Sequence, residues 1–214
     1  MTGKTHLAIG AAVGAAAAAY YTADLEQTGY YVGIAAFSAL SADLDGQSML
    51  SAKLGKISKF IREFALYGAF LFLAIVAYYY FAGKTLSPLV VGACGAAVLS
   101  GLVMKEGAIR NALVSVVGAA LIYAGYKYGM NWLMGFGLYV AWVPWLNHRG
   151  MTHTVWAIPI WGAIAWGLEQ QLELDGVTIV AMLGYLSHLV ADTLTPSGVK
   201  WLYPLVKKSF KIRL

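Results

Sequence analysis

The chain has 214 residues, of which 60% are hydrophobic and 12% are charged, about half of the roughly 25% charged content of a soluble domain. Its mean hydropathy of +0.67 and its 24 glycines are typical of a polytopic membrane protein, and they exclude an ordinary soluble enzyme and a disordered chain. The net charge is +5, and in such a protein the distribution of Lys and Arg residues indicates first the orientation in the membrane. We therefore expect a lipid bilayer, and no nucleic acid, as a partner.

Eight apolar runs follow one another along the chain. Since one membrane span needs about 20 residues, eight spans use most of the length, and we expect an all-α integral membrane protein with about eight transmembrane helices. The first run also allows a signal peptide, because Ala17 and Ala19 form an A-x-A-like site, although the run is long for that purpose. The runs lie at 6–22, 29–42, 63–82, 86–104, 108–126, 131–146, 152–168 and 176–195.

The basic residues predict the orientation in the membrane. A cytoplasmic N-terminus places 13 of the 15 Lys and Arg residues on the cytoplasmic side and leaves Lys84 and Lys127 outside, as the positive-inside rule requires. We expect a multi-pass protein of the plasma (inner) membrane with both termini in the cytoplasm. The segment 51–62 alternates apolar and basic residues at helical spacing, which predicts either an amphipathic helix in the interface or a basic flank of the next span.

Ionisable residues beside the spans are the first candidates for function, because such groups are costly in lipid. With the orientation above, all of them lie at cytoplasmic ends of spans. That common position indicates one shared site. The residues are His6, Asp43, Asp45, His148, Arg149, His153, His188 and Asp192.

Spacing indicates metal-binding chemistry for several of these side chains. His188 and Asp192 are four residues apart, so they share one helix face, as two ligands of one cation require, although a simple hydrogen-bonded pair has the same spacing. Asp43 and Asp45 offer two hard oxygen donors for a divalent ion, or belong to a solvated turn that Gly46 ends.

The segment 147–153 places two imidazoles and a guanidinium around a helix start. Arg149 can hold a phosphate through two parallel hydrogen bonds, or it can serve only as a positive-inside charge. His148 is the candidate general acid or base, because an imidazole titrates near neutral pH.

An internal duplication supports a shared site. One predicted helical hairpin begins with Gly3-Lys-Thr-His6 and ends at Asp43. A second begins with Gly150-Met-Thr-His153 and ends at Asp192. The His-to-Asp separations are 37 and 39 residues. Two such hairpins can be related by an axis along the membrane normal, although the few matching positions also allow chance similarity. We expect one membrane domain, 1–214, that consists of a first hairpin with its basic segment (1–62), a four-helix insertion (63–146), a second hairpin (147–204) and a basic tail (205–214).

Four motifs resemble the YdjM-like family of membrane-bound metal-dependent hydrolases: MTGKTH around His6, ADLD at 42–45, NHRGMTH at 147–153, and GYLSHLVADTLTPSG at 184–198. The family is distantly similar to zinc-dependent phospholipase C and P1-type nucleases. The resemblance implies a divalent metal, zinc first and manganese or magnesium next, as one or two ions. It implies His6, Asp43, Asp45, His153, His188 and Asp192 as ligands. The family commonly has His where this chain has Gly46, so one ligand is missing or replaced.

Three functions fit these observations. The leading hypothesis is a metal-dependent hydrolase that cleaves a phosphoester or phosphoanhydride of a membrane lipid at the cytoplasmic leaflet, with His148 and Arg149 in catalysis. Arg149, Thr195 and Lys200 would contact the substrate. The alternatives are a transporter or ion carrier that uses the His/Asp cluster, and a non-enzymatic scaffold with a structural metal.

Overall fold

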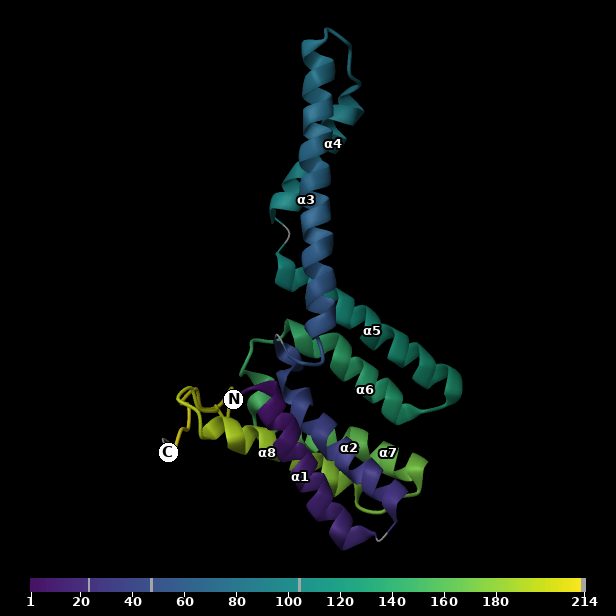
Figure 1. The fold of residues 1–214 in the computed structure, drawn as a ribbon, viewed down its shortest axis with the longest axis vertical. Helices are drawn as coiled ribbons and strands as arrows, with labels where there is room; N and C mark the ends of the chain where they lie inside the picture. The colour runs from purple at the N-terminus through teal and green to yellow at the C-terminus, as the bar shows by residue number, and fades with distance from the viewer. Residues whose placement is uncertain (23, 47, 104, 213–214) are drawn as a thin grey trace. The chain divides into compact units, whose positions relative to one another are not determined.

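The computed structural model describes residues 1–22, 24–46, 48–103 and 105–212, apart from the side chains of residues 100, 101 and 106. Within these residues the chain forms eight α-helices and no extended strand (Figure 1). The helices are α1 (Gly3–Tyr21), α2 (Leu25–Ser41), α3 (Ala52–Phe81), α4 (Pro88–Val103), α5 (Glu106–Tyr128), α6 (Asn131–Trp142), α7 (Ala157–Leu172) and α8 (Val177–Thr193). The predicted all-α class is confirmed.

Two helices have the length and composition needed to cross a membrane: α3, and residues Gly107–Tyr128 of α5. Only 6% of the apolar window of the first and 11% of that of the second is buried, so neither is the core helix of a soluble protein. The helices α2 and α8 have 17 residues each and are about 26 Å long, against roughly 30 Å of bilayer hydrocarbon. The eight apolar runs therefore correspond to eight helices of unequal length, of which two in the described residues are long and apolar enough to be membrane spans, and the number of spans stays a prediction.

The described chain divides into two compact units. One, here called the cluster unit, contains Met1–Ser51 and Val114–Leu214, and the other, the hairpin unit, contains Ala52–Leu113. Within the hairpin unit α3 and α4 lie side by side (Figure 1). The division at residues 62, 146 and 204 expected from the sequence stays a prediction, and Arg213 of the expected basic tail lies outside the described residues.

The basic segment 51–62 does not form a helix of its own. It is the start of α3, which continues without a break to Phe81. No Gly or Pro interrupts the chain between Gly55 and Gly68, so nothing separates the basic turns from the apolar ones. The segment is therefore helical and continuous with the next apolar run, and its expected position, in the interface or as the basic flank of a span, stays a prediction.

Glycines bring α1, α2 and α8 together in the cluster unit. The buried residues of α1 are His6, Gly10, Gly14 and Ala18, one on each turn of a single helix face. A Cβ atom at Gly10 would lie 2.8 Å from the Ala35 carbonyl oxygen, so a larger residue there would separate the helices. This is the small-residue packing typical of membrane helices, and it points His6 into the bundle.

Short 3-10 turns and the C-terminal segment complete one end of the bundle. The turn Ala42–Asp45 extends α2, and the turn Met151–His153 precedes α7. The Trp201 indole N–H donates to Thr193 Oγ1 at 3.0 Å, and the Ile212 N–H donates to the Thr193 carbonyl at 3.0 Å. Both ends of the chain lie at this end of the bundle (Figure 1), where the polar residues gather.

Candidate metal centre

Five predicted ligands converge at that end of the cluster unit. His6 comes from the glycine-lined face of α1, Asp43 from the 3-10 turn after α2, and His153 from the 3-10 turn before α7. His188 and Asp192 lie one turn apart on the buried face of α8. Four of these side chains are almost completely buried, and Asp43 is 21% exposed.

The distances between ligand atoms suit a metal ion. The Nε2 atoms of His153 and His188 are 3.2 Å apart, and Asp43 Oδ1 is 3.5 Å from each. Ligands about 2.0 to 2.2 Å from a tetrahedral ion are roughly 3.3 to 3.6 Å apart, so these separations match the edges of a coordination shell.

Asp192 extends the same group of atoms. Its Oδ1 is 3.3 Å from His6 Nε2, and its Oδ2 is 3.8 Å from His153 Nε2 and 3.9 Å from His188 Nε2. Among the described residues, three sets of three have ligand atoms close enough to share one ion: His6, Asp43 and His188; His153, His188 and Asp192; Asp43, Asp45 and His148. The second set shares His188 with the first, and Asp43 links the first to the third, so the residues fit one or two divalent ions.

Hydrogen bonds orient the histidines for metal binding. The Nδ1 of His188 is 2.7 Å from the Ala39 carbonyl, which can only accept, so the proton of the neutral ring is on Nδ1 and the Nε2 lone pair faces the other ligands. His6 is held differently, because its ring stacks on His188 at 3.8 Å while its Nδ1 has no hydrogen-bond partner among the described residues.

Asp45 lies behind the imidazoles. Its Oδ1 accepts from His148 Nδ1 at 2.7 Å, and its Oδ2 accepts from the Arg149 backbone N–H at 3.1 Å and from the Thr152 hydroxyl. Because protein donors already use both oxygens, this geometry is that of a carboxylate that orients histidines. The expected role of Asp45 as a metal ligand stays a prediction.

The pKa values of the turn residues indicate a site that suits a cation. Burial alone would raise the pKa of Asp43 and of Asp45, but contacts with His153 and other imidazoles hold both pKa values below their usual range. Burial lowers the pKa of His153, and its contacts with Asp43 and Asp45 outweigh this and raise the pKa to about 9. An ion that binds His153 must therefore displace a proton.

Arg149 and His148 border a polar cavity of about 170 Å³ that reaches Asp43 and Asp192. The Arg149 guanidinium is 3.1 Å from Asp192 Oδ2. Its backbone is in the left-handed region, with φ of 58°, which is costly for a residue with a side chain and is found most often at functional sites. His148 is half exposed, so its ring can contact a molecule in this cavity.

Two predicted substrate-binding residues do not line the cavity. The Thr195 hydroxyl donates to the Asp192 carbonyl at 2.7 Å, so it caps the end of α8. The Lys200 ammonium lies 5.9 Å from the centre of the Tyr203 ring. Neither side chain is recorded in contact with a ligand atom of the metal-binding group, and their substrate roles stay predictions.

Sequence reasoning missed two buried tyrosines that support the site. The Tyr185 hydroxyl donates to the Thr152 carbonyl at 2.7 Å, and the Tyr139 hydroxyl donates to the Ser41 carbonyl at 3.2 Å. Tyr185 precedes His188 by three residues on the same helix face, which was a usable signal. Nothing in the local sequence marks Tyr139.

The YdjM inner membrane protein family model matches residues 1–214. The chain belongs to this family. No curated protein and no solved structure gives a significant match. The YdjM match covers the middle helices as well as the four motifs, so the expected family is confirmed over the full length. An inner membrane family also agrees with the two span-length helices α3 and α5.

Proposed function

We propose that this YdjM family protein is a metal-dependent hydrolase that cleaves a phosphoester or phosphoanhydride of a membrane lipid at the cytoplasmic leaflet. The observation that supports this most strongly is the convergence of three imidazoles on two carboxylates, Asp43 and Asp192, which line the same polar cavity as the Arg149 guanidinium. Metal ligands, a proton-transferring group and an anion-binding group are the parts that phosphoester hydrolysis needs.

His6, Asp43, His153, His188 and Asp192 would hold the metal, zinc first and manganese or magnesium as alternatives. A bound divalent ion supplies positive charge for phosphate oxygens and lowers the pKa of water. The open side of the cavity near Asp43 and Asp192 favours this role over a structural metal, which has a closed shell of four protein ligands.

The chain's own residues supply the remaining chemistry. Asp45 fixes Nδ1 of His148, so Nε2 is the atom that gives or takes a proton at the cavity. Arg149 presents a planar guanidinium that can bind two phosphate oxygens, and its present partner Asp192 is a proposed metal ligand. A metal on Asp192 would weaken that ion pair and release the guanidinium for substrate.

The transporter hypothesis fits the position of the cluster less well. Transport sites are usually near the bilayer midplane at interrupted helices. Here the ligands come from the start of α1, the turn after α2, the turn before α7 and the last turns of α8. Ligands at helix ends suit a substrate that enters from the membrane surface.

We also propose that all eight helices cross the inner membrane, with both termini and the cluster on the cytoplasmic side. Reporter fusions at Glu26, in the first turn of α2, and at Glu173, between α7 and α8, test this. Periplasmic reporter activity is expected at both positions. Cytoplasmic activity at either one contradicts the arrangement.

The decisive test of the hydrolase combines metal analysis with an assay. The purified protein in lipid nanodiscs is expected to retain a divalent metal after dialysis and to release phosphate or a phosphorylated headgroup from at least one membrane lipid. A chelator should stop the release, and added Zn²⁺, Mn²⁺ or Mg²⁺ should restore it. A folded protein without metal-dependent release from any lipid in the panel would contradict the proposal.

A further inference from the structure

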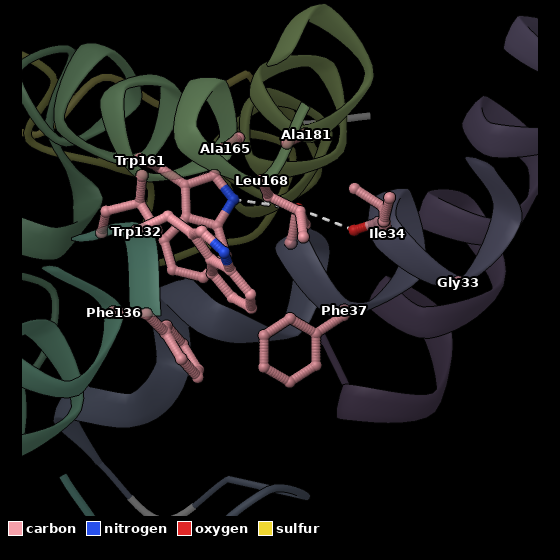
Figure 2. Close-up of a pocket in the computed structure, with 11 residues that line it drawn as sticks. Gly33, Ile34, Phe37, Trp132, Phe136, Trp161, Ala165, Leu168 and Ala181 are labelled. Atoms are coloured by element: carbon pink, nitrogen blue, oxygen red, sulfur yellow. Dashed lines mark hydrogen bonds between the residues drawn. The ribbon is translucent and has the colours of Figure 1, made fainter. Parts of the chain in front are cut away.

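A second cavity of the cluster unit is apolar. It has a volume of about 260 Å³ and is bordered by α2, α6, α7 and α8. Figure 2 shows the rings of Phe37, Trp132, Phe136 and Trp161 around it. The Trp161 indole N–H donates to Ser38 Oγ at 2.9 Å, and that hydroxyl donates to the Ile34 carbonyl at 2.7 Å. The polar atoms of Trp161 and Ser38 are thus satisfied, whereas the buried indole N–H of Trp132 has no hydrogen-bond partner among the described residues. The rest of the wall is apolar, so the cavity is suited to a mainly apolar occupant.

The cavity lies next to the metal-binding group, behind a layer of aromatic rings. The Trp161 ring is 5.1 Å from that of Tyr139 and 5.7 Å from that of Tyr185, measured between centroids. Tyr185 contacts Thr152, beside His153. Ser38 precedes Ala39, whose carbonyl accepts from His188. This layer of rings therefore separates the polar metal-binding group on one side from the apolar cavity on the other.

The mouth of the apolar cavity is near the polar one. Gly33 and Phe37 line the apolar cavity and are exposed, whereas Ala165 and Ala181 line it and are buried. Leu40, which lines the polar cavity, is three residues after Phe37 on α2. Side chains at this spacing are neighbours on a helix surface, so α2 provides a short apolar path from one cavity to the other.

We propose that the apolar cavity binds a hydrocarbon chain of the lipid whose phosphate enters the polar cavity. The position of the phosphate rests on the proposed function. Trp161 and Leu168 lie two turns apart on α7, about 11 Å, so the cavity accommodates a segment of one chain. The chain orients the phosphate at the cluster, and lipid phosphates are selected over water-soluble ones.

The experiment uses photocrosslinking, which does not depend on hydrolysis. The full chain in phosphatidylcholine nanodiscs receives phosphatidic acid with a diazirine in one acyl chain, or, in a second arm, an isoprenoid phosphate with a diazirine. Peptide mass spectrometry after illumination locates the crosslinks. Crosslinks to Ile34, Phe37, Trp161 or Leu168 in either arm support the proposal, and the reactive arm identifies the kind of chain.

Two pairs of variants provide matched controls. A Cβ atom at Gly33 or at Gly29 meets nothing within 4 Å, so Gly33→Leu narrows the mouth without a clash, and Gly29→Leu is its control one turn earlier. Ala165→Phe fills the buried end, and Ala163→Phe places the same ring on the exposed face of α7. Gly33→Leu and Ala165→Phe are each expected to lower the yield of cavity crosslinks about tenfold, because each would exclude roughly two methylene groups of the hydrocarbon chain from the cavity. The two control variants are expected to leave the yield unchanged.

The outcomes separate this inference from the proposed hydrolase. Lipid phosphate release without cavity crosslinks, or with crosslinks that neither cavity variant lowers, overturns the inference alone. Cavity crosslinks that Gly33→Leu and Ala165→Phe both lower support chain binding, even where no lipid is hydrolysed and the hydrolase proposal fails.

Discussion

The glycines of α1 in the cluster unit are packed differently from those of the hairpin unit. In the cluster unit, Gly10 and Gly14 meet the backbone of α2, and a Cβ atom at either position would lie within 3 Å of it. In the hairpin unit, Gly68 and Gly95 have nothing within 4 Å of such an atom. The first unit contains the His/Asp cluster, and none of the metal-binding groups found in the described residues involves the second. Close backbone packing therefore accompanies the site, whereas the hairpin presents mainly apolar surface.

The comparison teaches where sequence changes matter. A membrane span requires apolar surface, which many residues provide. A buried metal-binding group requires side chains placed within a few tenths of an ångström, and only rigid supporting contacts can do this. Changes at the closely packed glycines of the cluster unit should thus affect folding and chemistry together, while matched changes in the hairpin unit should affect neither.

The largest effect is expected from Gly14→Leu. A Cβ atom there would lie 2.5 Å from the Tyr31 carbonyl oxygen, and the backbone cannot move away without separating α1 from α2. We expect a loss of about 3 kcal/mol or more in the free energy of unfolding, measured as a lower melting temperature in detergent. Gly95→Leu in α4 is the control and should melt like the natural chain. Equal melting of both variants would contradict the difference between the units.

His188→Ala is expected to remove metal and activity while the protein stays folded. It deletes a proposed ligand that is close to His6, His153, Asp43 and Asp192. Metal content by mass spectrometry and phosphate release should fall to background together. His148→Ala is the informative comparison. It should keep the metal, but its turnover should fall about 10²- to 10⁴-fold, because it lacks the proposed proton-transferring imidazole. Full metal content in His188→Ala would remove this residue from the ligand set.

Arg149→Lys tests the reaction class. Lysine keeps the positive charge but lacks the planar pair of donors that fits phosphate. We expect turnover of a lipid phosphoester to fall about 10²- to 10³-fold, the effect of losing one hydrogen-bond donor that stabilises negative charge in the transition state. The metal content should not change. Steady-state kinetics on the best lipid substrate measures the turnover. Unchanged turnover would mean that Arg149 does not contact the phosphate.

The smallest effect is expected from Asp45→Asn. An amide can still accept from Thr152, but it holds the Nδ1 protons of His148 and His153 less strongly than a carboxylate. We expect metal affinity or turnover to fall about 10- to 100-fold, the usual range for a residue that orients ligands. Competition with a fluorescent chelator measures the affinity. A complete loss of metal would instead identify Asp45 as a direct ligand.

The sequence predicted the helices and the grouping of the His and Asp residues better than it predicted the residues that support them. The apolar runs and the positive-inside pattern indicate eight helices, because both depend on local composition. His6, Asp43, His153 and Asp192 could be grouped because the two hairpins share a spacing. Tyr139 could not be placed, since it reaches Ser41 across 98 positions of sequence and no local pattern reports such a contact.

Position along the chain was a poor guide to the contacts of two segments. The segment 51–62 is continuous with α3 because no Gly or Pro lies between Gly55 and Gly68, so nothing ends the helix where the segment meets the next apolar run. Thr195 and Lys200 were expected at the substrate because they follow α8, but the hydroxyl of Thr195 satisfies the carbonyl of Asp192 and Lys200 lies near Tyr203. Proximity in sequence to a ligand does not determine the direction of a side chain.

The lengths of the helices around the cluster have a consequence for the surrounding lipid. The helices α1, α2, α7 and α8 contain 19, 17, 16 and 17 residues, which corresponds to about 24 to 29 Å against roughly 30 Å of hydrocarbon. If they cross the membrane as proposed, hydrophobic mismatch thins the bilayer around the cluster unit. Headgroups next to the protein then lie deeper than those elsewhere in the leaflet, which shortens the distance a lipid phosphate must move to reach His148 and Arg149.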